Sequence, residues 1–364
     1  MSVTPLIQNV ATRARPEGNA MTDPLLDIQA LQVRYRTPRG VLTAVDGVDL
    51  RVQAGETVAL IGESGCGKTS LGKAVLRLMA PTSGRILFQG VDLAALPPRR
   101  LKPLRRDLQM IFQDPLAALD PRHAALRIVQ APLALHGTPR AQRTARAQAL
   151  FEQVGLPWSL RERLPHQLSG GQRQRLNIAR ALATSPRLVV CDEPVSALDV
   201  TLQTQVLALL RTLQDTLGVA YLFISHDISV VEALADRIAV MYLGRIVEVL
   251  PAGQLWQAAA HPYTRLLLAS VPGRDPGARR LPQQAAPAIE LPSPYALPQG
   301  CRFQSRCPQA TGLCRREDPA LSPLRPGQEV ACHHAATPSA LRPIPVRILT
   351  QADPCPTPKL SIAV

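Results

Sequence analysis

The stretch ETVALIGESGCGKTS, residues 56–70, decides the fold of this chain. An apolar run at 58–61 leads into a glycine-rich loop, and the loop leads into a segment with helical spacing. The loop fits the pattern G-x-x-x-x-G-K-[ST], in which successive backbone N–H groups close around phosphate oxygens. A simple glycine-rich turn is the alternative, and the strand–loop–helix context disfavours it. The stretch therefore predicts a phosphate-binding loop in an α/β protein.

This loop supplies most of the predicted nucleotide contacts. Lys68 is expected to reach the β- and γ-phosphate oxygens, and Thr69 to offer a hydroxyl to Mg²⁺. The predicted contacts in the loop are Gly62, Ser64, Gly65, Cys66, Gly67, Lys68, Thr69 and Ser70.

Polar residues stand at the ends of two further apolar strands. Asp192 and Glu193 follow RLVVC at 187–191, and His226 follows YLFIS at 221–225. The carboxyl ends of parallel strands meet at one sheet edge, so these side chains should gather near the phosphate loop. Asp192 is predicted to hold Mg²⁺, Glu193 to activate the attacking water, and His226 to contact the γ-phosphate. Taken alone, a turn at 192–193 and a structural histidine are the usual interpretations.

Two weaker candidates belong to the same site. Gln113, in IFQDP, sits where a strand gives way to a loop, and its amide can share Mg²⁺ or a water with the nucleotide. Tyr35 precedes the phosphate loop and can stack on adenine, although strand tyrosines are commonly packing residues.

A second candidate anion site begins at LSGGQ, residues 168–172. Ser169, Gly170, Gly171 and Gln172 open an expected helix, and a helix N-terminus has bare N–H groups that bind anions. Because the chain already has a phosphate loop, this second site raises the question of what it binds.

Composition limits the function without assigning it. The net charge of +14 admits nucleic acid or an anionic membrane surface as a partner. Aromatic residues make up only 3%, which leaves few stacking platforms for single strands. No eighteen consecutive residues are apolar, and residues 1–20 lack the apolar core of a signal peptide. We therefore expect a cytosolic chain with reduced cysteines.

In this order, the motifs resemble the nucleotide-binding subunit of ATP-binding cassette (ABC) transporters. The resemblance covers roughly residues 25–255, with the Walker A loop GESGCGKT, the Q-loop Gln113, the signature LSGGQ, the Walker B strand RLVVCDEP, the D-loop SALD and the switch His226. VCDEPVSALDV and HPYTRLLLASVP are similar to the oligopeptide/dipeptide importers, and closer to the second of their two paired ATPase subunits. The family's QDPYASLNP reads QDPLAALDP here, which leaves Gln113 intact.

The resemblance implies an ATPase that powers import of di- or oligopeptides or similar small solutes. Two such domains face head to tail, and Ser169, Gly170 and Gly171 of one cap the γ-phosphate bound by the other. The implied partners are a sibling ATPase as a heterodimer, or a second copy as a homodimer, with two transmembrane permease subunits and an extracytoplasmic solute-binding protein. The implied location is the cytoplasmic face of the inner membrane, as a peripheral protein.

Two other readings compete with the importer. A soluble ABC-type ATPase acting on nucleic acid or ribosomes is supported only by the net charge, and no nucleic-acid partner is expected. A binding module that has lost its ATPase activity is disfavoured because Lys68, Glu193 and His226 are all present.

Four cysteines cluster in the proline-rich C-terminal part: Cys301, Cys307, Cys314 and Cys332. Their spacing is not the paired C-x₂-C of common zinc modules, and a cytosolic disulfide is not expected. Four thiolates in a segment with little core of its own can hold a metal centre. The pattern resembles the C-terminal region of the oligopeptide/dipeptide ATPases, which implies a [4Fe–4S] cluster. Zinc and free thiols are the alternatives.

We expect an α/β fold of the P-loop NTPase (RecA-like) type. An N-terminal antiparallel β subdomain, a helical subdomain at about 114–182 and a small cysteine-containing C-terminal domain should join this core. The expected divisions are a disordered extension at 1–24, the ATP-binding domain at 25–265, the C-terminal domain at 266–340 and a tail at 341–364.

Overall fold

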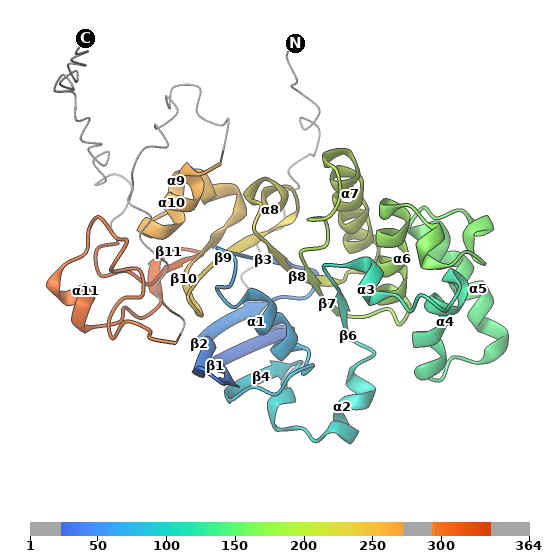
Figure 1. Cartoon of the computed structure of the whole chain (residues 1–364), viewed down its shortest axis with the longest axis horizontal. Helices are drawn as coiled ribbons and strands as arrows, with labels where there is room; N and C mark the ends of the chain where they lie inside the picture. Colours follow the sequence, from blue (N-terminus) through green and yellow to red (C-terminus); the bar gives the residue numbers. More distant parts are fainter. Residues whose placement is uncertain (1–22, 272–292, 294, 336–364) are drawn as a thin grey trace, which may run out of the picture.

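The structure is a computed structural model that describes residues 23–271, 293 and 295–335 (Figure 1). Most of the expected N-terminal extension, the expected tail and part of the expected C-terminal domain lie outside the described residues. Of the described helices, none combines the length and the apolar character needed to cross a bilayer.

The described part of the chain contains eleven α-helices, four short 3₁₀ helices and twelve strands. The helices are α1 Lys68–Val75, α2 Pro98–Leu104, α3 Pro115–Ala118, α4 Ala125–Leu135, α5 Arg140–Gln153, α6 Gly170–Leu182, α7 Val200–Leu217, α8 Ile228–Leu234, α9 Leu255–Ala258, α10 Pro262–Ala269 and α11 Gly312–Arg316. The strands are β1 Leu26–Thr37, β2 Gly40–Val52, β3 Thr57–Ile61, β4 Ser83–Phe88, β5 Val91–Asp92, β6 Leu108–Ile111, β7 Leu188–Asp192, β8 Ala220–Ser225, β9 Arg237–Tyr242, β10 Arg245–Pro251, β11 Ser322–Arg325 and β12 Gln328–Val330.

The main sheet has eight strands in the order β11-β12-β10-β9-β3-β8-β7-β6. Its five strands from β9 to β6 are parallel, and β3 lies among them with β8 and β9 as neighbours. Every residue of β3, β7 and β8 is buried, as expected for parallel strands covered on both faces. The parallel order confirms the predicted α/β fold and brings the ends of β3, β7 and β8 to one edge.

An antiparallel sheet of order β2-β1-β4-β5 packs against one face of the main sheet, with α1 between them (Figure 1). Side chains of β3 alternate between the two cores. Val58 and Leu60 join the core shared with this second sheet, whereas Ala59 and Ile61 join the core beneath the helices on the other face. The phosphate loop at the end of β3 is therefore fixed from both sides.

Helices α3 to α6 form a group beside β6 and β7 (Figure 1). In α6 the apolar residues Leu176, Ile178, Ala179 and Leu182 are buried, as the helical spacing predicts. They pack in one core with residues of α4 and α5, so the start of α6 is held by a rigid helical layer.

The C-terminal region adds strands to the main sheet. The β11–β12 hairpin pairs with β10 through Glu248 and Val330. The buried Glu248 carboxylate accepts hydrogen bonds from the backbone N–H of Ala260 at 2.7 Å and of His261 at 3.1 Å. It also accepts one from the Gln328 amide at 2.8 Å. This carboxylate thus ties β10, the entry to α10 and β12 together.

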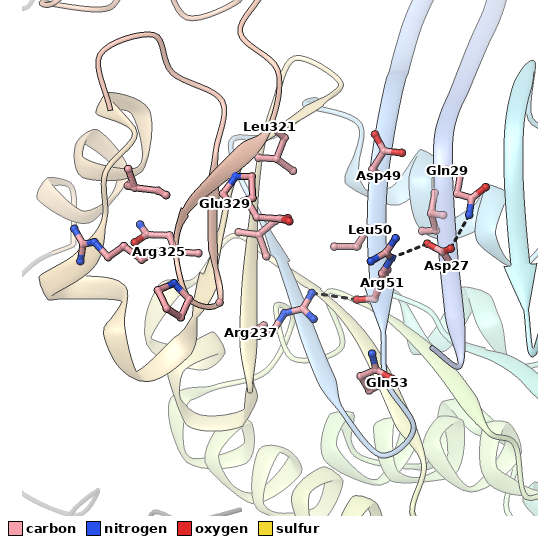
Figure 2. A pocket seen from close by; sticks show the side chains of 17 residues that line it. Asp27, Gln29, Asp49, Leu50, Arg51, Gln53, Arg237, Leu321, Arg325 and Glu329 are labelled. Atoms are coloured by element: carbon pink, nitrogen blue, oxygen red, sulfur yellow. Dashed lines mark hydrogen bonds and ion pairs between the residues drawn. The ribbon is translucent and has the colours of Figure 1, made fainter. Parts of the chain in front are cut away.

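A groove of about 880 Å³ lies between β2 and the β11–β12 hairpin (Figure 2). None of the predicted nucleotide contacts lines it. Arg51 lies 3.3 Å from a carboxylate oxygen of Asp27, and Arg237 donates to the Arg51 carbonyl oxygen at 3.2 Å. Arg237 therefore links the main sheet to the antiparallel sheet.

Candidate active site

The phosphate loop depends on glycines where other parts of the backbone come close. Gly62 has φ +154° and Gly67 has φ +109°. A Cβ atom at Gly62 would meet the Met241 carbonyl oxygen at 2.1 Å, and one at Gly67 would meet the Ala44 carbonyl oxygen at 2.0 Å. The loop therefore packs between β9 and β2, and a side chain at either glycine would displace it.

Lys68 is buried at the start of α1, with 5% of its surface exposed. Its ammonium group donates to the carbonyl oxygens of Gly62 at 2.8 Å and Glu63 at 2.9 Å. The neighbouring Cys66 thiol is also buried, and that burial raises its pKa even though Lys68 works in the opposite direction. Cys66 is thus a small neutral packing residue in the loop.

Thr69, in the first turn of α1, lies beside Asp192, at the end of β7. The Thr69 hydroxyl donates to an Asp192 carboxylate oxygen at 2.9 Å. Burial raises the pKa of Asp192, the Thr69 bond opposes this shift, and the nearby Glu193 charge adds to it. A hydroxyl and a carboxylate at the mouth of a phosphate loop are oxygen donors that fit Mg²⁺.

Glu193 is held on both carboxylate oxygens. Gln113 donates to one oxygen at 2.9 Å, and the other lies 3.1 Å from Nδ1 of His226. Glu193 has a positive φ of 46°, which is uncommon for a residue other than glycine. Such a backbone conformation persists where the surrounding structure holds the residue in it. The strand ends thus bring together three residues that are distant in sequence, as predicted.

Most of these side chains open onto one pocket of about 860 Å³. Of the predicted contacts at this edge, Gly62 and Asp192 do not line it. Predicted residues that line it are Tyr35, Ser64, Gly65, Cys66, Gly67, Lys68, Thr69, Ser70, Gln113, Glu193 and His226. The Tyr35 hydroxyl lies 3.0 Å from the Ser70 hydroxyl oxygen, which ties this ring to α1. Leu297, from the C-terminal region, also lines the pocket. Leu297 was not predictable from the sequence, because no pattern relates a proline-rich segment to a distant phosphate loop.

The signature residues lie outside this pocket. Ser169 caps α6 by accepting a hydrogen bond from the Gln172 backbone N–H at 3.3 Å. The Gln172 side chain accepts one in return from the Ser169 N–H at 3.0 Å, which completes a capping box. Gly170 and Gly171 form the first turn of α6. The phosphate loop and the signature residues are therefore two separate elements of this chain.

The four C-terminal cysteines are free thiols. Burial raises the pKa of Cys301, Cys307 and Cys332, and the charge of Cys314 adds to each of these three shifts. Burial is the largest cause at Cys301, whose pKa is raised to about 11. The Cys301 N–H donates to the Cys314 carbonyl oxygen at 2.8 Å. Within the described ranges, however, no three His, Cys, Asp or Glu side chains stand where they could hold a metal ion.

Comparison with known proteins agrees with these motifs. Residues 45–196 match the family described as "ABC transporter", and residues 247–314 match "Oligopeptide/dipeptide transporter, C-terminal region". The chain is 45% identical to the "Probable peptide ABC transporter ATP-binding protein y4tS" of Sinorhizobium fredii, over 92% of this chain and 96% of that protein. It is 47% identical to the "Putative peptide import ATP-binding protein BOV_A0347" of Brucella ovis, over 85% and 97%.

A solved structure shares the fold. The ATP-binding cassette MJ0796, in a dimeric post-hydrolysis state bound to ADP and Pi, has a TM-score of 0.58 and 28% identity. The match covers 62% of this chain and 98% of that one. The fold, the motifs and the relatives agree: this chain belongs to the ATP-hydrolysing, ATP-binding subunits of ABC transporters, in the group with the oligopeptide/dipeptide transporter C-terminal region.

Proposed function

We propose that the chain hydrolyses ATP to power the import of peptides or similar small solutes. The observation that carries the hydrolytic part is the Glu193 carboxylate, held between Gln113 and His226 beside the phosphate loop. The names of the relatives, which are peptide ABC transporter and peptide import proteins, favour peptides as the cargo. A nucleic-acid substrate has only the net charge in its favour.

Each side chain has a distinct role in the proposed reaction. Glu193 takes a proton from the attacking water while the water oxygen bonds to the γ-phosphorus and the bond to the ADP oxygen breaks. Lys68 leaves its two loop carbonyls to bind the β- and γ-phosphate oxygens. His226 orients Glu193 and contacts the γ-phosphate. Thr69, Asp192 and Gln113 would hold Mg²⁺, which neutralises phosphate charge when it is bound.

We propose that the complete ATP site forms between two subunits. The signature residues of α6 stand outside the pocket of their own chain, and a related cassette is dimeric with ADP and Pi bound. In a head-to-tail pair, Ser169, Gly170 and Gly171 of one subunit would cap the γ-phosphate held by the other. ATP then joins the subunits, and hydrolysis releases them. The second subunit is a sibling ATPase or another copy of this chain.

The partners can be identified by trapping the ATP-bound state. A tagged Glu193→Gln variant would be purified from detergent-solubilised membranes in the presence of ATP and Mg²⁺. The proteins that co-purify with it would be identified by mass spectrometry. We expect two polytopic membrane proteins and a sibling ATPase, with a solute-binding protein associated through the permease. The same chain without nucleotide is the control. Recovery only from the soluble fraction, with ribosomes or nucleic acid, would overturn the transport function and the peripheral location at the cytoplasmic face.

We further propose that Cys301, Cys307, Cys314 and Cys332 hold a [4Fe–4S] cluster. The Cys301 N–H donates to the Cys314 carbonyl oxygen at 2.8 Å, and the charge of Cys314 contributes to the raised pKa of Cys301, Cys307 and Cys332, so the four residues lie in one cluster. Four thiolates are the usual ligands of a [4Fe–4S] cluster. Anaerobically purified protein should contain about four iron atoms and four sulfides per chain. Cys307→Ser should lower both, whereas Cys191→Ser should not, because Cys191 is buried in β7. Stoichiometric zinc, or no metal at all, would contradict the proposal.

A further inference from the structure

The C-terminal region makes a direct ionic contact with the phosphate loop. Arg306 donates from two guanidinium nitrogens to the two carboxylate oxygens of Glu63, each at 2.9 Å. The exposed fractions of the two side chains are 17% and 27%, so water screens the pair only in part. A two-pronged contact of this kind fixes direction as well as distance.

Glu63 is itself part of the loop that holds Lys68. Its carbonyl oxygen accepts a hydrogen bond from the Lys68 ammonium group at 2.9 Å. Its backbone N–H donates to the hydroxyl of Tyr263, in α10, at 2.9 Å. The peptide groups on either side of this residue are therefore positioned by Lys68 and α10, and its carboxylate by Arg306.

The Arg306 guanidinium group packs against an aromatic cluster. The guanidinium carbon lies 5.8 Å from the ring centre of Tyr242 and 5.7 Å from that of Phe303. Tyr242, Tyr263 and Phe303 pack with ring centres 4.5 to 5.5 Å apart, and all three are almost fully buried. The cluster limits the positions that Arg306 can adopt.

A second arginine of the same segment braces the loop indirectly. Arg302 donates to the carbonyl oxygen of Leu243 and pairs with Asp46. Gly244, which follows Leu243 in the chain, donates its N–H to the carbonyl oxygen of Cys66, in the phosphate loop, at 2.9 Å. The segment between Cys301 and Cys307 is thus linked to the loop twice, directly through Arg306 and indirectly through Arg302.

We propose that Arg306 is a positioning residue for the phosphate loop, and that its contact with Glu63 sets the affinity of this site for nucleoside triphosphate. The inference rests on the proposed ATP-hydrolysing function and assigns part of nucleotide binding to the C-terminal region. Without the contact, the Glu63 end of the loop samples more conformations before nucleotide binds. Ordering it around the phosphates then costs more conformational entropy, so nucleotide binds less tightly.

Nucleotide binding and turnover by the full-length chain test this role. Arg306→Gln should raise the Kd for MgADP and the KM for ATP about tenfold, with kcat within about twofold of the parent. Arg306→Lys keeps the charge but loses the two-pronged geometry, so its effect should be intermediate. Glu63→Gln should match Arg306→Gln, and the double variant should lose no more than either single one.

A matched ion pair controls for docking of the C-terminal region. Arg245 pairs with Asp318 at 3.0 Å, which joins that region to β10 on the side of Asp46 and Arg302 and not at Glu63. Asp318→Asn should leave Kd and KM unchanged within about twofold. Equal losses in Asp318→Asn and Arg306→Gln, or additive losses in the double variant, would overturn the positioning role. Failure of the parent chain to bind nucleotide would instead refute the proposed function.

Discussion

Glu193→Gln is expected to lower ATP turnover by about 10²- to 10⁴-fold while ATP binding persists. The amide keeps the size of the carboxylate and can occupy the same position between Gln113 and His226, but it cannot accept the proton of the attacking water. The γ-phosphate then stays in place, and the ATP-bound dimer should accumulate. Phosphate release at saturating ATP measures the first effect, and size-exclusion chromatography with ATP and Mg²⁺ measures the second.

The matched control is Glu152→Gln in α5, which removes an exposed carboxylate far from the pocket. It should turn over ATP at the parent rate. If the Glu193→Gln variant hydrolyses ATP at the parent rate, the assignment of Glu193 as the catalytic base is wrong. A loss of turnover together with a loss of ATP binding would assign it a role in holding the nucleotide instead.

The sequence predicts those parts of the site that local rules determine. The spacing of GESGCGKTS requires a strand before it and a helix after it, and β3 and α1 have those places. One apolar strand ends in Asp192 and another is followed by His226, which predicts parallel neighbours. In the structure β8 pairs with β3, and β7 pairs with β8, both in parallel. Once the strands are parallel, the contact of Glu193 with His226 follows from the geometry of one sheet edge.

Contacts that depend on the path of the chain were not predictable. The edge of β10 could pair with any free strand, and no local pattern selects β12 some eighty residues later. The salt bridge between Glu63 and Arg306 depends on that pairing and on the packing of Phe303 against Tyr242. For the same reason, the C-terminal region appeared from the sequence to be an accessory domain, whereas its hairpin continues the main sheet.

Gly170→Asp is expected to abolish turnover, by about 10²-fold or more, while the chain still folds and binds ATP. A Cβ at Gly170 has room, because its nearest neighbour, a methyl carbon of Leu198, lies 3.8 Å away. An aspartate in the first turn of α6 also interacts favourably with the helix dipole, so the fold should not suffer. Its charge would instead repel the γ-phosphate that the proposed partner presents. Phosphate release and the Kd for ATP separate the two effects.

Mixing variants decides whether the signature acts across subunits. This test applies when the purified parent chain hydrolyses ATP without a sibling subunit and pairs head to tail with a second copy. A mixture of the Gly170→Asp and Lys68→Ala variants should then regain ATPase activity. In that mixed pair, the intact phosphate loop of one chain faces the intact signature of the other, whereas neither variant alone contains a complete site. Gly253→Asp, at an exposed glycine with open space around it, controls for the added charge and should remain active. No recovery on mixing would mean that each chain completes its own site, and the head-to-tail pair would be wrong.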